Sequence, residues 1–166
     1  ATIGVDCGED NLGVAGQYGR TLVMADVRAL PFRDASLGGV HCSHVVEHMQ
    51  PHDAHRLLCE ADRVLRPGGV LVLQAPMMWR GFWDDLTHVR PYPPCAILEY
   101  LRKASAPLAL PRVRADYTVI RLRWRYAPLR VGNPYVDAVL HQLSRWGFPW
   151  VRRNGYMLVL RKSDGR

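Results

Sequence analysis

The sequence predicts an α/β fold built on a parallel sheet, and three observations support this prediction. Short apolar runs of strand length recur through the first half of the chain, separated by turns or by helical spacing. The helical pattern of residues 53–65 leads through a Pro-Gly-Gly turn into a fourth apolar run. A helix followed directly by a buried strand is the unit of α/β folds. The last third of the chain holds two more strand-length runs.

The first three strands are expected at residues 1–6, 21–26 and 38–43, with the sequences ATIGVD, TLVMAD and GGVHCS. Weak helical spacing fills the interval between the first two. The first strand ends at Asp6 and the second ends at Asp26. Because helix or loop separates these runs, we expect the strands to lie parallel.

The clearest element is a helix that we expect Asp53 to cap. Its apolar face recurs at helical spacing and consists of Leu57, Leu58, Ala61, Val64 and Leu65. Pro67, Gly68 and Gly69 are expected to stop the helix and to turn the backbone into the strand VLVLQAP, residues 70–76.

Residues 77–92 show no sustained period and mix aromatic, acidic and basic side chains. We expect a loop that leaves the carboxyl end of a strand, where ligands of open α/β sheets bind. The remaining elements are expected to be helix, strand, helix and strand, at residues 94–104, 117–126, 134–146 and 155–161. Since no repeat or Ser/Gly linker interrupts the chain, residues 1–166 are expected to form a single domain.

Composition is that of an ordinary globular protein, with 48% hydrophobic and 22% charged residues in a chain of 166. No apolar run approaches the ~20 residues that a membrane-spanning helix needs, and the amino terminus lacks a signal-peptide pattern. We therefore expect no membrane span and a cytoplasmic location. The 4 cysteines form no CxxC pair, which favours reduced core thiols over a zinc site or disulfides.

The net charge of +7 raises the question of nucleic-acid binding, because clustered arginine neutralises phosphates. Most of the 22 basic residues are arginines that spread along the chain instead of forming one block. This distribution favours a solvated basic surface, so nucleic acid is not the expected partner.

The acids at the two strand ends have two interpretations. At the carboxyl edge of a nucleotide-binding sheet, Asp6 would accept hydrogen bonds from ribose hydroxyls and Asp26 would meet an exocyclic amine of adenine. Alternatively, both carboxylates cap the turn that follows.

The succession GVD, ADVRALPF, HCSHVVEHM and RVLRPGGVLVLQAP resembles the class I S-adenosylmethionine-dependent methyltransferases, in the small-molecule, type 11-like branch with LPF and HVLEH-type motifs. The match covers about residues 3–104. It implies a Rossmann-like methyltransferase fold: a mostly parallel sheet with helices on both faces and a carboxyl-terminal antiparallel strand pair. It also implies S-adenosylmethionine as cofactor, with residues 1–76 as the cofactor half and residues 77–166 as the acceptor loop and carboxyl-terminal part.

Carried over by position, the resemblance makes Asp6, beside Cys7, the ribose-binding acid. Asp26 and Val27 become the adenine contact, through a carboxylate and a backbone amide. The remaining cofactor residues, Ser43 and His44, would line the methionine end near the methyl group.

Methyl transfer needs in-line positioning and, for a hydroxyl acceptor, a general base. Histidine suits that role because its unperturbed pKa of about 6.5 lies near working pH. The candidates are His44, His48 and His88, and the sequence does not choose among them.

His44, Glu47 and His48 are spaced so that they share one face of a helical turn, and His88 lies in the following loop. Ubiquinone-pathway O-methyltransferases and small-RNA 2′-O-methyltransferases bind a divalent cation through a similar ExxEH motif. Here His44 replaces the first glutamate, whereas magnesium prefers oxygen ligands. We therefore assign no metal and expect Glu47 and His48 to form a hydrogen-bonded pair.

The segment FWDDLTHVRPY resembles one found in members of the branch that are linked to sugar and cell-surface polysaccharide chemistry. Trp79, Phe82 and Trp83 are expected either to stack on an acceptor or to pack on the core as a lid. Arg90 is expected to pair with an anionic acceptor or with Asp84 or Asp85.

The family begins with a strand and a glycine-rich GxGxG loop, and neither has a counterpart here beyond CGED at residues 7–10. The missing strand is central in the family's sheet, between its second and fourth strands. Its loss would leave backbone groups unpaired, so we expect either that the chain is part of a longer protein or that a rearranged sheet or a partner chain fills the gap.

The sequence therefore predicts methyl transfer from S-adenosylmethionine to a small-molecule acceptor, with a sugar or polysaccharide precursor as one candidate. The alternatives are a non-catalytic interaction module and an RNA methyltransferase. The aromatic helix at residues 134–146, with nearby Phe148 and Trp150, is expected to pack on the sheet; an acceptor cap or a homodimer contact are its alternatives.

Overall fold

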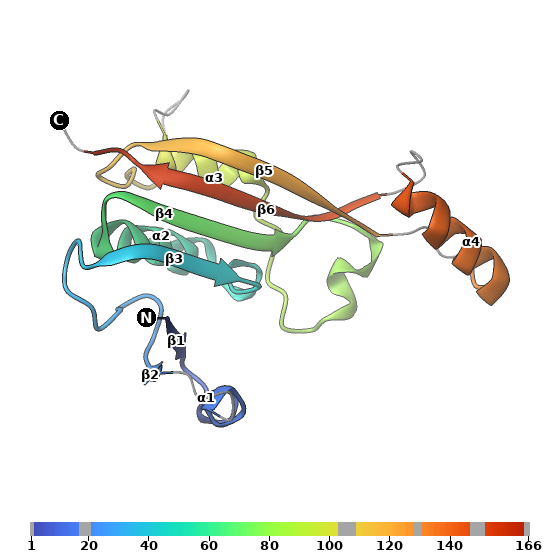
Figure 1. The fold of residues 1–166 in the computed structure, drawn as a ribbon, viewed down its shortest axis with the longest axis horizontal. Helices are drawn as coiled ribbons and strands as arrows, with labels where there is room; N and C mark the ends of the chain where they lie inside the picture. Colours follow the sequence, from blue (N-terminus) through green and yellow to red (C-terminus); the bar gives the residue numbers. More distant parts are fainter. Residues whose placement is uncertain (1, 17–20, 103–108, 128–130, 147–151, 165–166) are drawn as a thin grey trace.

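The computed structural model describes residues 2–16, 21–102, 109–127, 131–146 and 152–164 (Figure 1). Strands and helices alternate through most of this chain. In order, the elements are β1 (Ile3–Asp6), α1 (Glu9–Gly16), β2 (Thr21–Met24), β3 (Leu37–Ser43), the 3-10 helix η1 (Val46–His48), α2 (Pro51–Val64), β4 (Leu65–Pro76), the 3-10 helix η2 (Arg80–Asp84), α3 (Pro94–Leu101), β5 (Tyr117–Ala127), α4 (Pro134–Arg145) and β6 (Arg152–Lys162). The α/β fold predicted from the sequence is confirmed.

The strands form two sheets. One is the parallel pair β1-β2, and the other has the order β3-β4-β6-β5. β3 and β4 run parallel, whereas β6 lies antiparallel to both β4 and β5. The expected antiparallel pair at the carboxyl end of the chain is therefore confirmed, and it extends the parallel pair β3-β4 on one side.

The break between the two sheets falls where the central strand of the family was expected to be missing. Figure 1 shows the β1-β2 pair below the edge strand β3. Within the described parts of the chain, no strand pairs with the free edge of β1 or with that of β3. No rearranged strand from these residues fills the position, so both edges present unpaired backbone groups.

α2 covers the large sheet with an apolar face. It begins at Pro51 with Gln50 as N-cap, so the prediction that Asp53 caps it is wrong. Asp53 instead accepts a hydrogen bond from Arg28 Nη1 at 3.0 Å. The helix already ends at Val64, because the chain enters β4 at the next residue.

β4 therefore starts before the expected Pro-Gly-Gly turn and includes it. The pairing of β3 with β4 shifts register between Leu37 and Gly39, which accommodates the extra residues of β4 as a bulge. Gly68 adopts φ 72°, a left-handed conformation in which a side chain would be strained.

The core lies between the large sheet and the helices α2 and α3. Leu71 and Leu73 of β4 and Leu158 and Leu160 of β6 are almost fully buried. They form one cluster with side chains of both helices, namely Ala54, Leu57, Leu58, Ala61, Ile97 and Leu101. Burial of each leucine contributes about 1.5–3 kcal/mol, so this cluster supplies a large part of the stabilisation of the fold.

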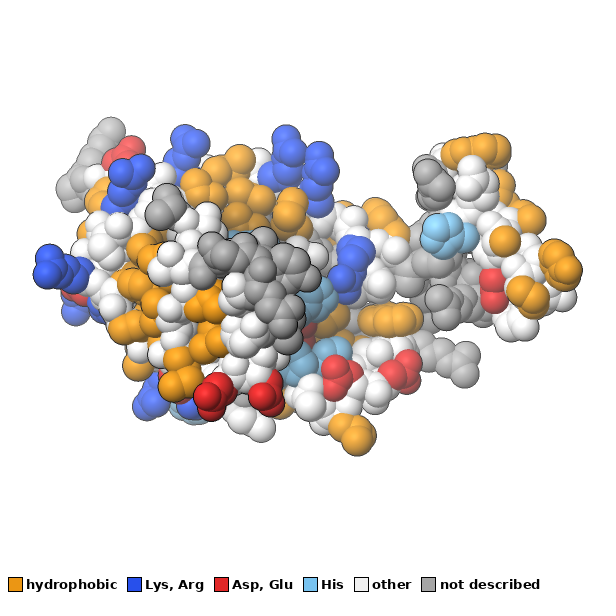
Figure 2. All heavy atoms as spheres, turned by 60° about the horizontal axis from the view of Figure 1, so that its bottom comes forward, with side chains coloured by type: hydrophobic (Ala, Val, Ile, Leu, Met, Phe, Trp, Pro, Cys, Tyr) orange, Lys and Arg blue, Asp and Glu red, His pale blue; other side chains and the backbone are white. Residues whose placement is uncertain are grey.

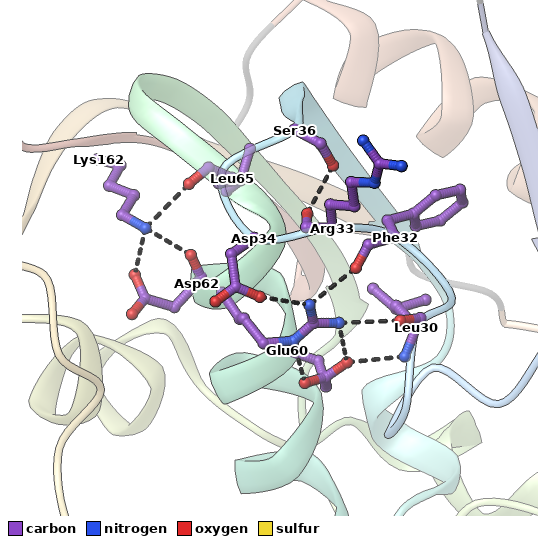
Figure 3. Close-up of polar contacts among 10 residues, drawn as sticks. Leu30, Phe32, Arg33, Asp34, Ser36, Glu60, Asp62, Leu65 and Lys162 are labelled. Carbon is purple, nitrogen blue, oxygen red and sulfur yellow. Dashed lines mark hydrogen bonds and ion pairs between the residues drawn. The ribbon is translucent and has the colours of Figure 1, made fainter.

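Polar contacts from α2 hold the LPF turn in place (Figure 3). The guanidinium of Arg63 donates to the carbonyls of Leu30 and Phe32, each at 2.8 Å. It also pairs with Glu60 at 2.7 Å, and a carboxylate oxygen of Glu60 accepts from the Leu30 amide at 2.7 Å. The LPF motif therefore places the chain between β2 and β3 against α2.

α4 lies beyond the end of the large sheet (Figure 1). The prediction that this helix packs on the sheet is wrong, because Tyr135 is 84% exposed and Trp146 is 70% exposed. The Asn133 side chain accepts from the Tyr135 amide at 3.0 Å and so caps the helix start. Phe148 and Trp150, also assigned to this region, lie outside the described residues, as do residues 103–104 of the helix expected before β5.

The composition predicted no membrane-spanning helix and reduced cysteines in the core. The described residues include no helix that is long and apolar enough to cross a membrane. All four cysteines are free thiols, and burial raises the pKa of the Cys42 thiol to about 12. Buried Cys42 agrees with the prediction of core cysteines, whereas that prediction is wrong for Cys7 and Cys95, which are exposed.

Candidate functional site

The end of β3 leads directly into the cluster of candidate histidines. Ser43, the last residue of β3, lies opposite Gln74 of β4. The backbone then turns at His44, which has φ 55°, and the His44 amide donates to the Gln74 carbonyl at 2.9 Å. This left-handed turn is strained for a residue other than glycine, so the surrounding contacts must hold it.

The His44 ring lies between the carboxylate of Glu47 and the guanidinium of Arg125. Its Nδ1 lies 2.9 Å from Glu47 Oε1, and its Nε2 lies 3.1 Å from Nη1 of Arg125 on β5. Because arginine only donates, Nε2 must accept and Nδ1 carries the proton. His44 is thus present as the tautomer that donates to Glu47, and Arg125 occupies the nitrogen that would act as a base.

Glu47 anchors the loop that follows β4. Its backbone carbonyl accepts from the amides of Val89 at 2.8 Å and Arg90 at 3.3 Å. Its side chain is 0% exposed, and its hydrogen-bond partner is His44. The expected Glu47–His48 pair is therefore wrong: His48 faces Thr87 instead, and Glu47 Oε2 has no hydrogen-bond partner among the described residues.

The loop brings His88 beside His48. The two ring centroids are 4.9 Å apart. His88 Nδ1 lies 2.6 Å from the Phe82 carbonyl, and His48 Nδ1 lies 2.9 Å from Thr87 Oγ1. The three candidate histidines thus gather around Glu47, and Figure 2 shows histidine and acidic side chains close together on this face.

The aromatic residues of the loop have different environments. Phe82 is 0% exposed and stacks on His88 with ring centroids 4.6 Å apart, which supports packing on the core over stacking on an acceptor. Trp83 is 53% exposed and meets Phe82 edge-on. Trp79 is half-buried. The Arg90 guanidinium lies over the Tyr92 ring at 5.2 Å, a position other than the expected pairing with Asp84 or Asp85.

Asp6 ends β1 and shapes the turn after it. Its Oδ1 accepts from the Gly8 amide at 2.7 Å and from Asn11 Nδ2 at 3.1 Å, while the intervening Cys7 is exposed. The carboxylate thus caps the following turn, as the alternative interpretation proposed. Its Oδ2 appears in neither of these bonds, so one oxygen is left for a ligand hydroxyl.

Asp26 forms hydrogen bonds with Arg28, a pairing that was not predicted from the sequence. Arg28 donates to both carboxylate oxygens, at 2.6 to 3.0 Å, and its backbone amide donates to Oδ1 at 2.8 Å. These hydrogen bonds hold the pKa of Asp26 below its usual range. The adjacent Val27 packs against the core. An adenine amine would have to share this carboxylate with Arg28.

Comparisons with known proteins concern the first part of the sequence and the fold of the chain. Residues 1–73 match the family model described as methyltransferase domain. An uncharacterised 37.1 kDa protein in transposon Tn4556 of Streptomyces fradiae is 39% identical over 64 residues, which are 39% of this chain and 16% of that protein. The chain thus spans only a small part of the length of this relative.

Solved structures share the fold over nearly the whole chain. An S-adenosylmethionine-dependent methyltransferase from Archaeoglobus fulgidus superposes with a TM-score of 0.65 at 21% identity, covering 96% of this chain and 75% of that one. A putative methyltransferase from Bacillus halodurans C-125 gives a TM-score of 0.66 at 19% identity, covering 98% and 83%.

The match over residues 1–73 and the shared fold agree: the chain has the fold of class I S-adenosylmethionine-dependent methyltransferases, and its first part is similar to the methyltransferase domain family.

Two residues of the site, Arg125 and Thr87, were not predicted from the sequence. Arg125 lies in an alternating basic strand and gave no signal that distinguishes it from its exposed neighbours Arg121 and Arg123. The hydroxyl of Thr87, in the THVRP stretch, donates to Asp85 Oδ1 at 2.6 Å and helps to hold the pKa of Asp85 below its usual range. The position of Thr87 next to the candidate His88 was the feature of the sequence that could have indicated its role.

Proposed function

We propose that this chain transfers a methyl group from S-adenosylmethionine to a small-molecule acceptor. The observation that carries the proposal is the series of strand ends: polar side chains follow β1, β2 and β3 in the order of the family motifs, within the region that matches the methyltransferase domain. In open α/β sheets, ligands bind at these strand ends.

In this proposal Asp6 holds the ribose, because a carboxylate oxygen accepts hydrogen bonds from vicinal hydroxyls. Asp26 and Val27 contact the adenine, with Arg28 sharing the Asp26 carboxylate. Ser43 and His44 lie at the methionine end. Cys7 is exposed beside Asp6 and contributes its backbone.

The base is one of His44, His48 and His88. The sulfonium supplies the electrophilic methyl group when the cofactor is bound, so the protein contributes position and removal of a proton. His44 serves as base only after Arg125 leaves its Nε2. His48 and His88 each use Nδ1 for a contact within the loop, which leaves Nε2 for another partner.

We propose a sugar or polysaccharide precursor as the acceptor, since exposed Trp83 offers an apolar face beside the histidines. The test is transfer of labelled methyl groups to nucleotide sugars and oligosaccharides. A Trp83→Ala variant should raise KM for a sugar acceptor and leave kcat nearly unchanged, because the ring lies outside the buried cluster. Labelling of amines only, or of no acceptor, would contradict this choice.

A non-catalytic interaction module is the second candidate, and the open edges of β1 and β3 favour it. An RNA methyltransferase has less support, because Figure 2 shows basic side chains in several separate places. RNA binding that weakens steeply with salt would favour it.

A homodimer formed through the exposed face of α4 is proposed as well, with sedimentation of a Trp146→Ala variant as its test. The cytoplasmic location stays a prediction.

A further inference from the structure

Three potential metal ligands meet in the cluster around η1. One ligand atom each from Glu47, His48 and His88 lie within 4.8 Å of one another. Two imidazoles and one carboxylate are ligands of first-row transition cations. Their proximity alone is weak evidence, so the question is whether their remaining contacts point the right atoms toward a common centre.

Glu47 supplies the strongest indication. Its carboxylate is completely buried, and His44 satisfies only Oε1. In the part of the chain that the structure describes, buried Glu47 Oε2 has no hydrogen-bond partner. Buried polar atoms are nearly always paired, and leaving one unpaired costs about 1–3 kcal/mol, more for a charged group. A cation at Oε2 would remove this cost.

The contacts of His48 leave the correct nitrogen available. Thr87 Oγ1 donates to Asp85 Oδ1 at 2.6 Å, so the same hydroxyl oxygen accepts from His48 Nδ1 at 2.9 Å. The Thr87 carbonyl lies 3.2 Å from the same Nδ1 and also only accepts. His48 Nδ1 therefore carries the proton, and Nε2 presents a lone pair.

His88 is oriented in the same way. Its Nδ1 lies 2.6 Å from the Phe82 carbonyl, which can only accept, so the lone pair is again on Nε2. Metal-binding histidines almost always donate the other ring N–H to a carbonyl or carboxylate, which fixes the tautomer. Asp85 Oδ2 lies 3.8 Å from His88 Nε2 and is a further oxygen beside the cluster.

The cluster is also held firmly. The amides of Val89 and Arg90 bond to the Glu47 carbonyl, which ties the His88 loop to η1. Buried Phe82 stacks on the His88 ring. Ligands of a tetrahedral cation with bonds of ~2.1 Å stand ~3.4 Å apart, so small side-chain rotations bring these atoms into contact with one ion.

We propose that Glu47 Oε2, His48 Nε2 and His88 Nε2 bind one divalent first-row transition cation, such as Zn²⁺. The three protein ligands leave at least one coordination position open for water or an acceptor oxygen. This site uses the lone pairs of His48 and His88, so His44 becomes the only one of the three histidines left for proton transfer. The metal site itself does not depend on methyl transfer.

The test is binding of Zn²⁺ alone to the chelator-treated chain, measured by competition with a chromophoric chelator. Co²⁺ provides a second readout, because its visible spectrum reports coordination number. Glu47→Gln keeps the size of the buried side chain but removes the charge, and His48→Ala removes a nitrogen ligand. His52→Ala is the matched control, since His52 is an exposed histidine on α2.

We expect one Zn²⁺ per chain with an affinity that falls as pH decreases, because imidazoles must be deprotonated to bind. Even second-shell changes weaken metal affinity ~10–100-fold, so Glu47→Gln and His48→Ala should each weaken it at least ~100-fold while His52→Ala does not. Circular dichroism verifies that the variants are folded. Absence of stoichiometric binding, or equal loss in all three variants, would overturn the proposal. Should Glu47→Gln fail to fold, His48→Ala decides.

Discussion

Arg125 on β5 donates a hydrogen bond to Nε2 of His44 at the end of β3, across 3.1 Å, although the two residues are 81 positions apart in the chain. This contact joins the outermost strand at one side of the large sheet to the turn at the other side. Together with the Glu47 carboxylate at Nδ1, this contact fixes which nitrogen of His44 carries the proton.

The first prediction concerns that tautomer. In Arg125→Ala, His44 should keep the Nδ1–H form, because the Glu47 carboxylate still accepts from Nδ1, but Nε2 loses its hydrogen-bond donor and its nitrogen-15 chemical shift should change. Nitrogen-15 NMR of the imidazole at mildly alkaline pH would show the change. Stability should fall by less than ~1 kcal/mol, since the contact is exposed. Arg123→Ala is the matched control, and a similar His44 spectrum in all three proteins would contradict the assignment.

The LPF turn is predicted to depend on Arg63. Arg63→Ala removes hydrogen bonds to two carbonyls and the pairing with Glu60 and Asp34, and should destabilise the protein by ~2–4 kcal/mol. Urea denaturation measures the change. Arg33→Ala, on the exposed turn itself, should cost less than ~0.5 kcal/mol. Equal effects would mean that the contacts of Arg63 add little.

Acid stability should depend on Glu60. Hydrogen bonds from Arg63 hold the pKa of Glu60 below its usual value of 4.5. The unfolded chain therefore binds more protons at this residue, so its contribution is present above about pH 4.5 and is lost as pH falls through the lower folded pKa. Glu60→Gln should flatten the loss of unfolding free energy in this acidic range. An unchanged pH profile would exclude this linkage.

The buried pair of Tyr117 and Asp62 provides a separate test of the core. The Tyr117 hydroxyl donates to Asp62 Oδ1 at 2.9 Å, and burial raises the pKa of Tyr117 above its usual range. Tyr117→Phe leaves a buried carboxylate oxygen with less pairing and should cost ~1–3 kcal/mol in chemical denaturation. Tyr126→Phe, at an exposed position of the same strand, should be neutral.

Hydrogen exchange should distinguish the two sheets. β1 and β2 contain no buried residue and form a two-stranded pair, which is marginal by itself, whereas β4 and β6 carry the buried core. Amides of β1 and β2 should exchange much faster than those of β4 and β6. Uniform protection across both sheets would mean that another contact supports the small sheet.

The strands and α2 were predictable because their signal is local periodicity, which packing then reinforced. Asp53 was assigned as a cap because its residue type fits, yet Pro51 already occupies the first turn and Arg28 takes the carboxylate. The predicted helix at residues 134–146 exists, but its contacts could not be predicted, since an amphipathic face suits the sheet and other surfaces equally.

The sequence predicted which residues form the cluster, but it did not predict their hydrogen-bond partners. The spacing of His44, Glu47 and His48 placed them on one turn, and the motif in the following loop singled out His88. Two contacts decided the pairing: Arg125 fixes His44 from a distant strand, and the THVRP loop draws His48 to Thr87. Neither contact has a local signature in the sequence.

The most direct measurement is a calorimetric titration of this chain with S-adenosylhomocysteine, the product form of the cofactor. The account predicts 1:1 binding that is lost in Asp6→Ala and kept in Asp10→Ala, an exposed acid on α1. Absence of binding by the folded chain, or equal binding by both variants, would contradict a cofactor site at the strand ends.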